Sequence, residues 1–132
     1  MATTDKPSAS GSQPVDLYGA ALRVFFKMAA IWELTESEQM RILGQPTIST
    51  LQGWRNGDVA MCDDDTLVRI SHLLAIYKAI HTVFNVDDRA DKWMRSPNKA
   101  PLFNGRSAID RMADGNVKDL VIVRQYLETM IW

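Results

Sequence analysis

Apolar residues recur three or four positions apart through most of the chain, which is the spacing of one face of an α-helix. One such stripe predicts a helix over residues 15–33, and another predicts a helix of about five turns over residues 63–84. The first stripe consists of Val15, Tyr18, Leu22, Phe25, Phe26, Ala29 and Trp32, and the second of Leu67, Ile70, Leu73, Leu74, Tyr77, Ile80, His81 and Phe84. No segment alternates with a period of two for long enough to predict a strand, so the expected fold class is all-α.

Capping signals predict two short helices between these long ones. Thr35 and Glu38 form a capping box, and Gly44 supplies a left-handed stop for the helix that follows them. Thr47 caps a second short helix, which is predicted over residues 48–56 and ends at a glycine. Two short helices joined by a tight turn have the proportions of a helix-turn-helix unit.

Three further helices are predicted after the long one. The first covers residues 87–94, the second begins at the cap Ser107 and ends at Gly115, and the last runs from Val117 nearly to the end of the chain. The run Asp63, Asp64 and Asp65 precedes the long helix, where negative charge stabilises a helix N-terminus, so these residues are predicted to cap it rather than to bind a metal ion.

Length and composition set the organisation and limit the function. At 132 residues there is room for one main domain with at most a small appended module. Residues 1–14 are predicted to be a disordered tail, residues 15–62 a helix-turn-helix and dimerisation region, and residues 63–132 a small helical domain that includes the long connecting helix. The single Cys62 and the lack of a long apolar run indicate a cytoplasmic protein without a membrane segment.

The helix over residues 48–56 is a candidate for DNA contact. Its side opposite the apolar residues carries polar side chains of the kinds that read base edges or grip phosphates. The candidate DNA-binding residues are Thr47, Ser49, Thr50, Gln52, Gly53, Arg55 and Asn56. The charge balance argues against strong binding, because the whole chain has a formal net charge of −1 and phosphate contacts supply most of the affinity for DNA. The alternative is a helix hairpin that only packs or dimerises, and contact by an oligomer is favoured over contact by a monomer.

No arrangement of residues in the sequence predicts catalysis. The two histidines, His72 and His81, are nine positions apart on one helix and share no ligand geometry. Neither a nucleophile with a base nor a glycine-rich phosphate loop is present. We therefore expect a protein that is not an enzyme, with no catalytic, cofactor-binding or metal-binding residues.

The loop over residues 98–107 has the composition of a docking segment. Pro101 and Gly105 shape its backbone, while Leu102 and Phe103 are adjacent apolar anchors. Arg106 and Arg111 are placed to reach acidic partners. Two roles are open for Phe103, which either contacts a partner or fills the core of its own domain.

The segment N-K-A-P-L-F-N-G-R-S-A-I-D-R-M-A-D-G from Asn98, followed by Val123, Arg124, Tyr126, Leu127 and Trp132, resembles the toxin-binding domain of the MbcA/ParS/Xre antitoxin family. Trp93 also stands where the family has a Trp shortly before its N-x-x-P-L-F motif, and residues 47–57 are similar to the helix-turn-helix of Xre-type antitoxins. Asn104 departs from the family, which often has a glycine at that position.

This resemblance implies a type II antitoxin that dimerises through its N-terminal part. It would bind a RES-domain toxin, an enzyme that consumes NAD or transfers ADP-ribose, by blocking the active site, and would repress its own operon by binding operator DNA. The implied toxin-binding residues are Asn98, Pro101, Leu102, Phe103, Asn104, Gly105, Arg106, Ser107, Arg111, Tyr126, Ile131 and Trp132. The indole and carboxylate of Trp132 are hypothesised to imitate part of the toxin's ligand. The alternative function is a stand-alone helix-turn-helix transcriptional regulator.

Overall fold

The computed structural model describes residues 15–131, and within them it contains seven helices and no strand. The helices are α1 (Val15–Ile31), α2 (Glu36–Ile42), α3 (Ile48–Arg55), α4 (Asp64–Val83), α5 (Asp87–Arg95), α6 (Ala108–Met112) and α7 (Val117–Thr129). The predicted all-α class is therefore confirmed for this part of the chain. The tail predicted for residues 1–14 lies outside the described residues.

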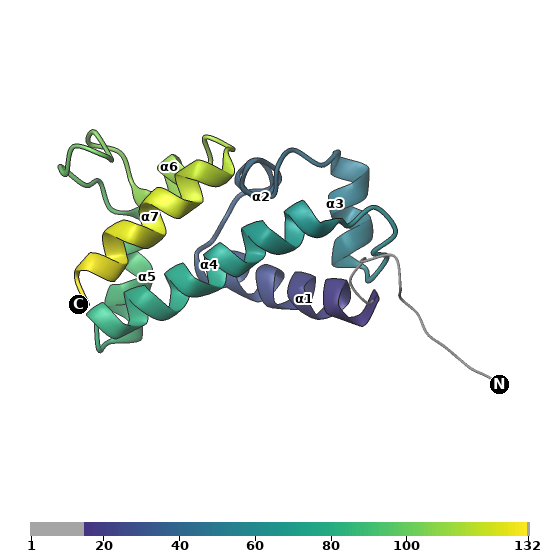
Figure 1. Cartoon of the computed structure of the whole chain (residues 1–132), viewed down its shortest axis with the longest axis horizontal. Helices are drawn as coiled ribbons and strands as arrows, with labels where there is room; N and C mark the ends of the chain where they lie inside the picture. The colour runs from purple at the N-terminus through teal and green to yellow at the C-terminus, as the bar shows by residue number, and fades with distance from the viewer. Residues whose placement is uncertain (1–14, 132) are drawn as a thin grey trace.

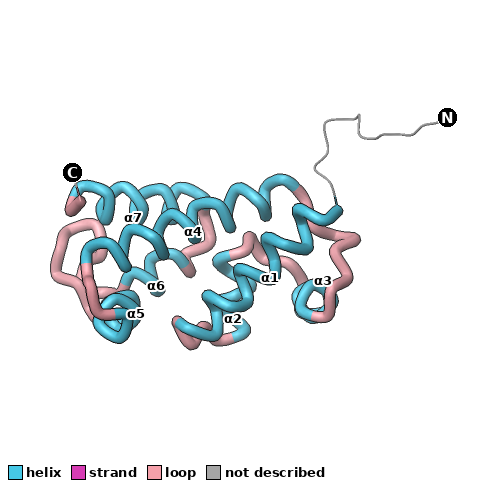
Figure 2. Tube along the Cα trace, turned by 90° about the horizontal axis from the view of Figure 1, so that it is seen from below, coloured by secondary structure: helices cyan, strands magenta, loops and turns pink. Residues whose placement is uncertain are grey.

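Helix α4 is the spine of the molecule (Figure 1). Helix α7 lies along it and runs in the same direction, and the two form one layer, with the other helices below them in Figure 2. Helix α1 packs on α4 and also contacts α3, while α5 packs against α4, α6 packs against α7, and α5 and α6 contact each other. Because α4 contacts elements from both ends of the sequence, it joins the N-terminal helices to the C-terminal ones.

One hydrophobic core extends through both parts of the chain, from Leu22 on α1 to Leu127 on α7. The predicted stripes locate most of it, with differences on α4. Leu74 is 38% exposed, and Ile76, which the stripe omits, is completely buried. Ile76 is buried because α1 and α7 both pack on α4, so the buried face of α4 is broader than a stripe facing a single neighbour.

The predicted capping boxes are present. Glu38 N–H donates to Thr35 Oγ1 at 3.1 Å while Thr35 N–H donates to Glu38 Oε1 at 2.9 Å, and Ser107 and Asp110 make the corresponding pair at the start of α6. Asp63 caps α4 by accepting from Thr66 N–H at 3.0 Å. The start of each of these helices can be predicted from the residue types at that point, because each cap accepts hydrogen bonds from backbone N–H groups that lack a partner within the helix.

Helix α1 ends two residues earlier than predicted, because Glu33 adopts a left-handed conformation with a φ of 55°. Leu34 N–H then donates to Ala29 C=O at 2.8 Å, which closes the helix in the manner usually served by glycine. Arg95 of α5 stabilises this turn by donating to the carbonyl oxygens of Trp32 and Glu33 at 3.1 and 2.6 Å. The contact with α5 therefore stabilises a left-handed turn that cannot be predicted from the residues near it in the sequence.

Arg69 is a buried cation of α4, only 8% exposed, that ties three elements together. Its Nε lies 2.9 Å from Asp65 Oδ2, and its Nη1 donates to Ile42 C=O at 3.2 Å and to Gly115 C=O at 3.0 Å. A Cβ at Gly44 would lie 3.0 Å from the guanidinium carbon, so a glycine leaves room for the arginine. The turn after α2 is thereby attached to the loop that precedes α7.

No helix among residues 15–131 is both long enough and apolar enough to cross a membrane.

Candidate functional site

The 98–106 loop is closed on itself by hydrogen bonds between its two ends. Asn98 N–H donates to Arg106 C=O at 3.0 Å, and Gly105 N–H donates to Asn98 C=O at 2.9 Å. The side chain of Asn98 accepts from Ala100 N–H at 2.8 Å. Asn104 and Gly105 turn the chain with φ values of 53° and 83°, a left-handed shape that asparagine tolerates better than most residues with a side chain. The loop therefore has a defined shape.

An aromatic cluster of Trp93, Phe103 and Tyr126 anchors the loop to the helices. Phe103 is completely buried, and its ring lies edge-on to Trp93 of α5 at 5.9 Å and to Tyr126 of α7 at 5.1 Å between centroids. Trp93 and Tyr126 are nearly parallel at 6.3 Å. Because Phe103 is completely buried, its side chain fills the core of its own domain and is not exposed to a partner. Any effect of this side chain on a partner must therefore act through the shape of the loop.

Arg111 of α6 supports the loop from inside. Its Nη1 donates to Leu102 C=O, and its Nε lies 3.0 Å from Oδ1 of Asp119, which is only 7% exposed. The other oxygen of Asp119 accepts from Asn116 N–H at 3.2 Å. Arg111 was expected to reach an acidic partner, but its guanidinium is already engaged within the domain. Sequence reasoning missed Asp119, and the signal available was a carboxylate three residues into a helix, where it can satisfy the N-terminal backbone.

Arg106 is at the surface and pairs with Asp114. Its Nη1 and Nη2 lie 3.0 and 2.7 Å from the two carboxylate oxygens, and both side chains are partly exposed. This two-point contact holds the pKa of Asp114 below its ordinary value and raises the pKa of Arg106. The pair joins the end of the loop to the turn after α6, and sequence reasoning did not anticipate it.

The predicted toxin-binding residues fall into an exposed set and a supporting set. Pro101, Asn104, Gly105 and Arg106 are exposed at the surface of the loop, together with Lys99, which the prediction omitted. The supporting set is buried or half-buried and consists of Asn98, Leu102, Phe103, Ser107, Arg111 and Tyr126. The surface available to a partner is thus smaller than the predicted list.

Ile131 belongs to a different place on the molecule. It lines a groove of about 400 Å³ between α4 and α7, together with Lys78, Thr82 and Glu128. Trp132 lies outside the described residues. The structure therefore places Ile131 away from the loop residues with which the prediction grouped it.

The candidate DNA-binding residues on and around α3 differ in how exposed and how free to bind they are. Ser49, Gln52 and Asn56 are exposed, whereas the hydroxyl of Thr47 is occupied in capping α3 and donates to Thr50 Oγ1 at 3.0 Å. Arg55 donates to Gln39 Oε1 at 3.1 Å. Helix α3 therefore has a polar outer face, but the side chains of Thr47 and Arg55 already make hydrogen bonds within the protein.

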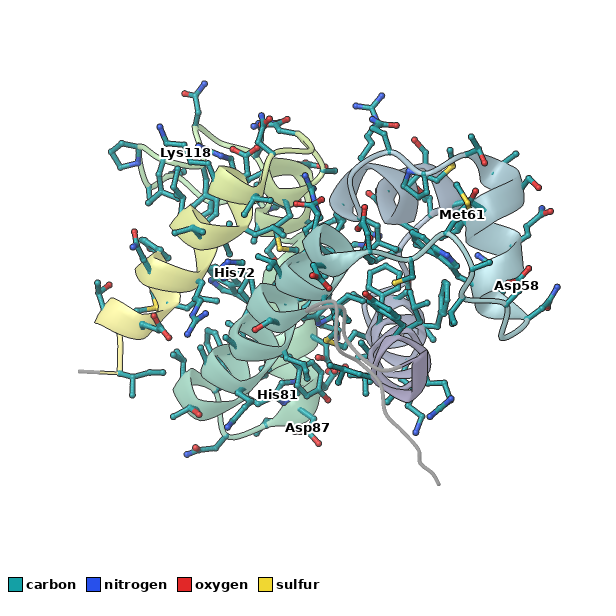
Figure 3. The ribbon with its side chains drawn as sticks, turned by 45° about the vertical axis from the view of Figure 1, so that its right-hand side comes forward. Asp58, Met61, His72, His81, Asp87 and Lys118 are labelled. Atoms are coloured by element: carbon teal, nitrogen blue, oxygen red, sulfur yellow. The ribbon has the colours of Figure 1, made fainter. Side chains whose placement is uncertain are left out.

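The residues considered for metal binding are engaged in separate contacts. Asp64 accepts from Tyr18 at 3.1 Å, and Asp65 pairs with Arg69. The nitrogens of His81 lie 3.0 Å from Asp87 and from Asp91, while His72 faces α7 (Figure 3). Among the described residues there is no group of three or more His, Cys, Asp or Glu side chains that is placed to hold a metal ion.

The segment that contains the 98–106 loop is similar in sequence to a domain of known proteins. Residues 81–131 match the family described as the antitoxin Xre/MbcA/ParS C-terminal toxin-binding domain. Over 109 residues the chain is 41% identical to the uncharacterized protein y4oB of Sinorhizobium fredii, an alignment that covers 83% of this chain and 82% of the relative. No solved structure matches the chain. The matched segment contains the loop, its aromatic anchors and Arg111, and its similarity to a toxin-binding domain supports a role in a toxin–antitoxin system. The chain belongs to the same family as the Sinorhizobium fredii protein y4oB, and its residues 81–131 form a domain of the Xre/MbcA/ParS antitoxin type.

Proposed function

We propose that this protein is a type II antitoxin whose partner is a RES-domain toxin, an enzyme that consumes NAD or transfers ADP-ribose. It neutralises the toxin by covering the entrance to the active site with its C-terminal domain. The observation that carries the proposal is the match of residues 81–131 to the toxin-binding family, since that segment contains the closed, partly exposed 98–106 loop.

The exposed loop residues are the proposed contact surface. Lys99, Pro101 and Asn104 present an exposed tip with one cation, beside the surface pair of Arg106 and Asp114. Phe103 and Arg111 hold the backbone in place beneath it. A loop that is ordered before binding loses little conformational entropy on association, which favours affinity. Ile131 and Trp132 are proposed as a second contact, with Trp132 entering the toxin's active site.

The proposed organisation assigns a different task to each part of the chain. Residues 15–62 form the dimerisation and helix-turn-helix region, which binds operator DNA through the outer face of α3, and residues 63–132 form the toxin-binding domain. A homodimer would bring two α3 helices to one operator, which compensates for the few cations of each protomer. We place the protein in the cytoplasm, where the toxin's substrates are found.

Co-expression with the product of the neighbouring gene tests the toxin partner. Co-purification is expected, with rescue of growth and loss of the toxin's NAD-consuming activity in the complex. The variant Lys99→Glu reverses a charge at the tip of the loop and is expected to weaken the complex about tenfold or more. Its matched control is Lys27→Glu, which reverses an exposed charge on α1 far from the loop. Equal affinity of the two variants for the toxin would refute the loop as the contact surface.

Deletion of Trp132 alone tests the second contact. The truncated protein is expected to bind the toxin more weakly and to inhibit it less, because truncation of a buried Trp anchor costs about 2–4 kcal/mol in a typical interface. Full inhibition by a deletion variant that has the circular dichroism and melting temperature of the parent chain would show that Trp132 is not needed for inhibition.

A stand-alone transcriptional regulator is the second candidate function, favoured by the exposed polar side chains of Ser49, Gln52 and Asn56 on α3. It predicts specific binding to the upstream promoter in a gel-shift assay and no complex with the neighbouring gene product. Loss of promoter binding in Arg55→Ala, with toxin binding retained, would instead indicate a single protein with two separate surfaces.

A further inference from the structure

Helices α1 and α3 enclose a groove of about 580 Å³ at the end of the molecule opposite the 98–106 loop. Its lining includes the rings of Phe26 and Trp54 and two small residues of α1, Gly19 and Ala30. Sites for small molecules in proteins commonly measure about 300–1,000 Å³ and are lined mainly by apolar groups with a few polar ones. The groove has the size and character of such a site.

The charged residues of this groove are all positive. Arg23 and Lys27 project from α1 and Arg55 from α3, and no carboxylate is among the described residues that line the groove. Arg23 and Lys27 are exposed, and neither forms an ion pair within the described part of the chain. Arg55 lies 3.9 Å from Oε2 of Glu36, so Arg23 and Lys27 are the two cations of the groove that no described carboxylate neutralises. Unneutralised cations beside apolar rings attract a negatively charged group.

Arg55 marks the boundary of the cationic region. Its guanidinium carbon lies 5.3 Å from the centroid of the Phe26 ring, and its Nη2 donates to Gln39 at 3.1 Å. Beyond it, Phe26 and Arg55 also line a second hollow of about 380 Å³, whose wall includes Glu33. An anionic group is therefore accommodated on the side of Arg23 and Lys27 and disfavoured on the side of Glu33.

Trp54 contributes a second independent feature. It is only 5% exposed and forms part of the groove wall, and its indole Nε1 is buried without a hydrogen-bond partner. Buried donors without an acceptor are rare in folded proteins, because the loss of hydration is not compensated. An acceptor atom on a bound molecule would satisfy this donor if the Trp54 ring turned to bring Nε1 to the groove surface.

We propose that the groove between α1 and α3 binds a small organic anion that has a flat apolar body and a phosphate, sulfonate or carboxylate group. The body lies on Phe26 and Trp54, and the anionic group is held by Arg23, Lys27 and Arg55. Occupation of the groove links α1 to α3, the helix that carries the exposed polar side chains. This site shares no residue with the 98–106 loop, so it does not depend on the identity of the toxin.

The test uses 8-anilinonaphthalene-1-sulfonate as the anionic probe and N-phenyl-1-naphthylamine as its uncharged counterpart, both titrated into the full chain. Saturable one-to-one binding of the sulfonate is expected. The double variant Arg23→Gln/Lys27→Gln is expected to weaken it about tenfold or more, since each removes a charged contact. The uncharged probe should bind both proteins equally.

A matched control removes the same net charge elsewhere. Lys78→Gln/Lys118→Gln changes two exposed lysines on α4 and α7 and is expected to leave the affinity for the sulfonate unchanged. Equal weakening in the two double variants would overturn the proposal, as would the absence of saturable binding. The variant Ala30→Leu narrows the groove and is expected to weaken both probes.

The indole N–H signal of Trp54 in a ¹H–¹⁵N spectrum gives a readout at the site itself, assigned by Trp54→Phe. It is expected to shift on addition of the sulfonate, whereas the signal of Trp93 should not. Displacement of the probe by random-sequence duplex DNA, with no shift of the Trp54 signal by the probe, would assign the cations to nucleic acid and overturn the proposal.

Discussion

Single residues make this fold specific where the chain must depart from regular geometry. Glu33, Gln45 and Asn104 all have positive φ values although none is a glycine. Such conformations cost energy for residues with a Cβ, so surrounding contacts must hold them. Glu33 is held by hydrogen bonds from Arg95, and Asn104 is held within the closed 98–106 loop. These positions explain why local sequence signals alone misplace the end of α1.

Cys62 is predicted to be a slow nucleophile. Burial of the thiol, reinforced by the carboxylates of Asp63 and Asp64, raises its pKa to about 11 from 9.0. Because the thiolate is the reactive form, its fraction at neutral pH falls about 100-fold relative to a thiol of ordinary pKa. Alkylation by iodoacetamide is expected to be correspondingly slow in the native protein and fast in urea, as measured by intact mass. Native and unfolded protein reacting at the same rate would contradict this.

Helices in this protein are held to one another by a few arginines at their ends as well as by the core. Arg95 at the end of α5 contacts Glu38 of α2 through two nitrogens, at 3.1 and 2.7 Å, and also donates to the carbonyls of the turn that follows α1. Arg69 performs the same task between α4, the end of α2 and the loop before α7. These contacts determine how the N-terminal helices are placed relative to the matched C-terminal domain.

Replacement of Arg95 tests this attachment. Arg95→Met is expected to lower the free energy of unfolding by about 2–3 kcal/mol, because it leaves Glu38 and the carbonyls of the turn after α1 without their donor. Glu38→Gln should cost about 1 kcal/mol, since the carbonyl contacts remain. The control is Lys92→Met on the same helix, which removes an exposed pair with Asp88 and is expected to change stability by less than about 0.5 kcal/mol.

Urea unfolding of the three variants and of the double variant Arg95→Met/Glu38→Gln measures these differences. A coupling energy near zero between Arg95 and Glu38 would show that the pair does not hold the helices together.

At the scale of the whole molecule, one core passes through both the N-terminal helices and the matched domain. Leu22 of α1, Ile76 of α4 and Leu127 of α7 belong to the same buried cluster. A shared core favours a single cooperative unfolding transition rather than separate melting of two parts. The two proposed contact surfaces, the 98–106 loop and the outer face of α3, lie at opposite ends of this unit.

Acid is predicted to destabilise the whole fold in two steps. Hydrogen bonds from Arg95 and Arg106 hold the pKa values of Glu38 and Asp114 below their ordinary values of 4.5 and 3.8. The stability that these carboxylates contribute is present above their ordinary pKa values and is lost as the pH falls through the lowered ones. Burial, with Arg124 nearby, also lowers the pKa of His72 from 6.5. The unfolded chain therefore takes up the histidine proton first, and stability begins to fall below about pH 6.5.

The midpoint of urea unfolding, measured from pH 8 to pH 3, checks this dependence. The variant His72→Gln is expected to flatten the curve between about pH 7 and pH 5.5, and Glu38→Gln to flatten it only at lower pH. A midpoint that rises on acidification in the parent chain would contradict the assignment.

Most of the helical content could be predicted from local patterns. Residue spacing predicted α1 and α4, and cap residues such as Thr35 and Ser107 predicted where shorter helices begin. These signals are readable because a helix repeats every 3.6 residues and because its first N–H groups need nearby acceptors. The candidate loop was also found from composition, since proline, glycine and adjacent apolar residues mark a shaped connection.

The all-α class, the approximate helices and the segment that matches a toxin-binding domain follow from residue patterns along the chain. The packing of the helices was needed to show that Phe103 is buried between Trp93 and Tyr126, that Arg111 pairs with Asp119, and that Arg23 and Lys27 join Arg55 around one groove. The physical reason is that spacing along a chain sets the direction of each side chain relative to its own helix. Burial, pairing and pocket formation depend on which other helices pack against that face.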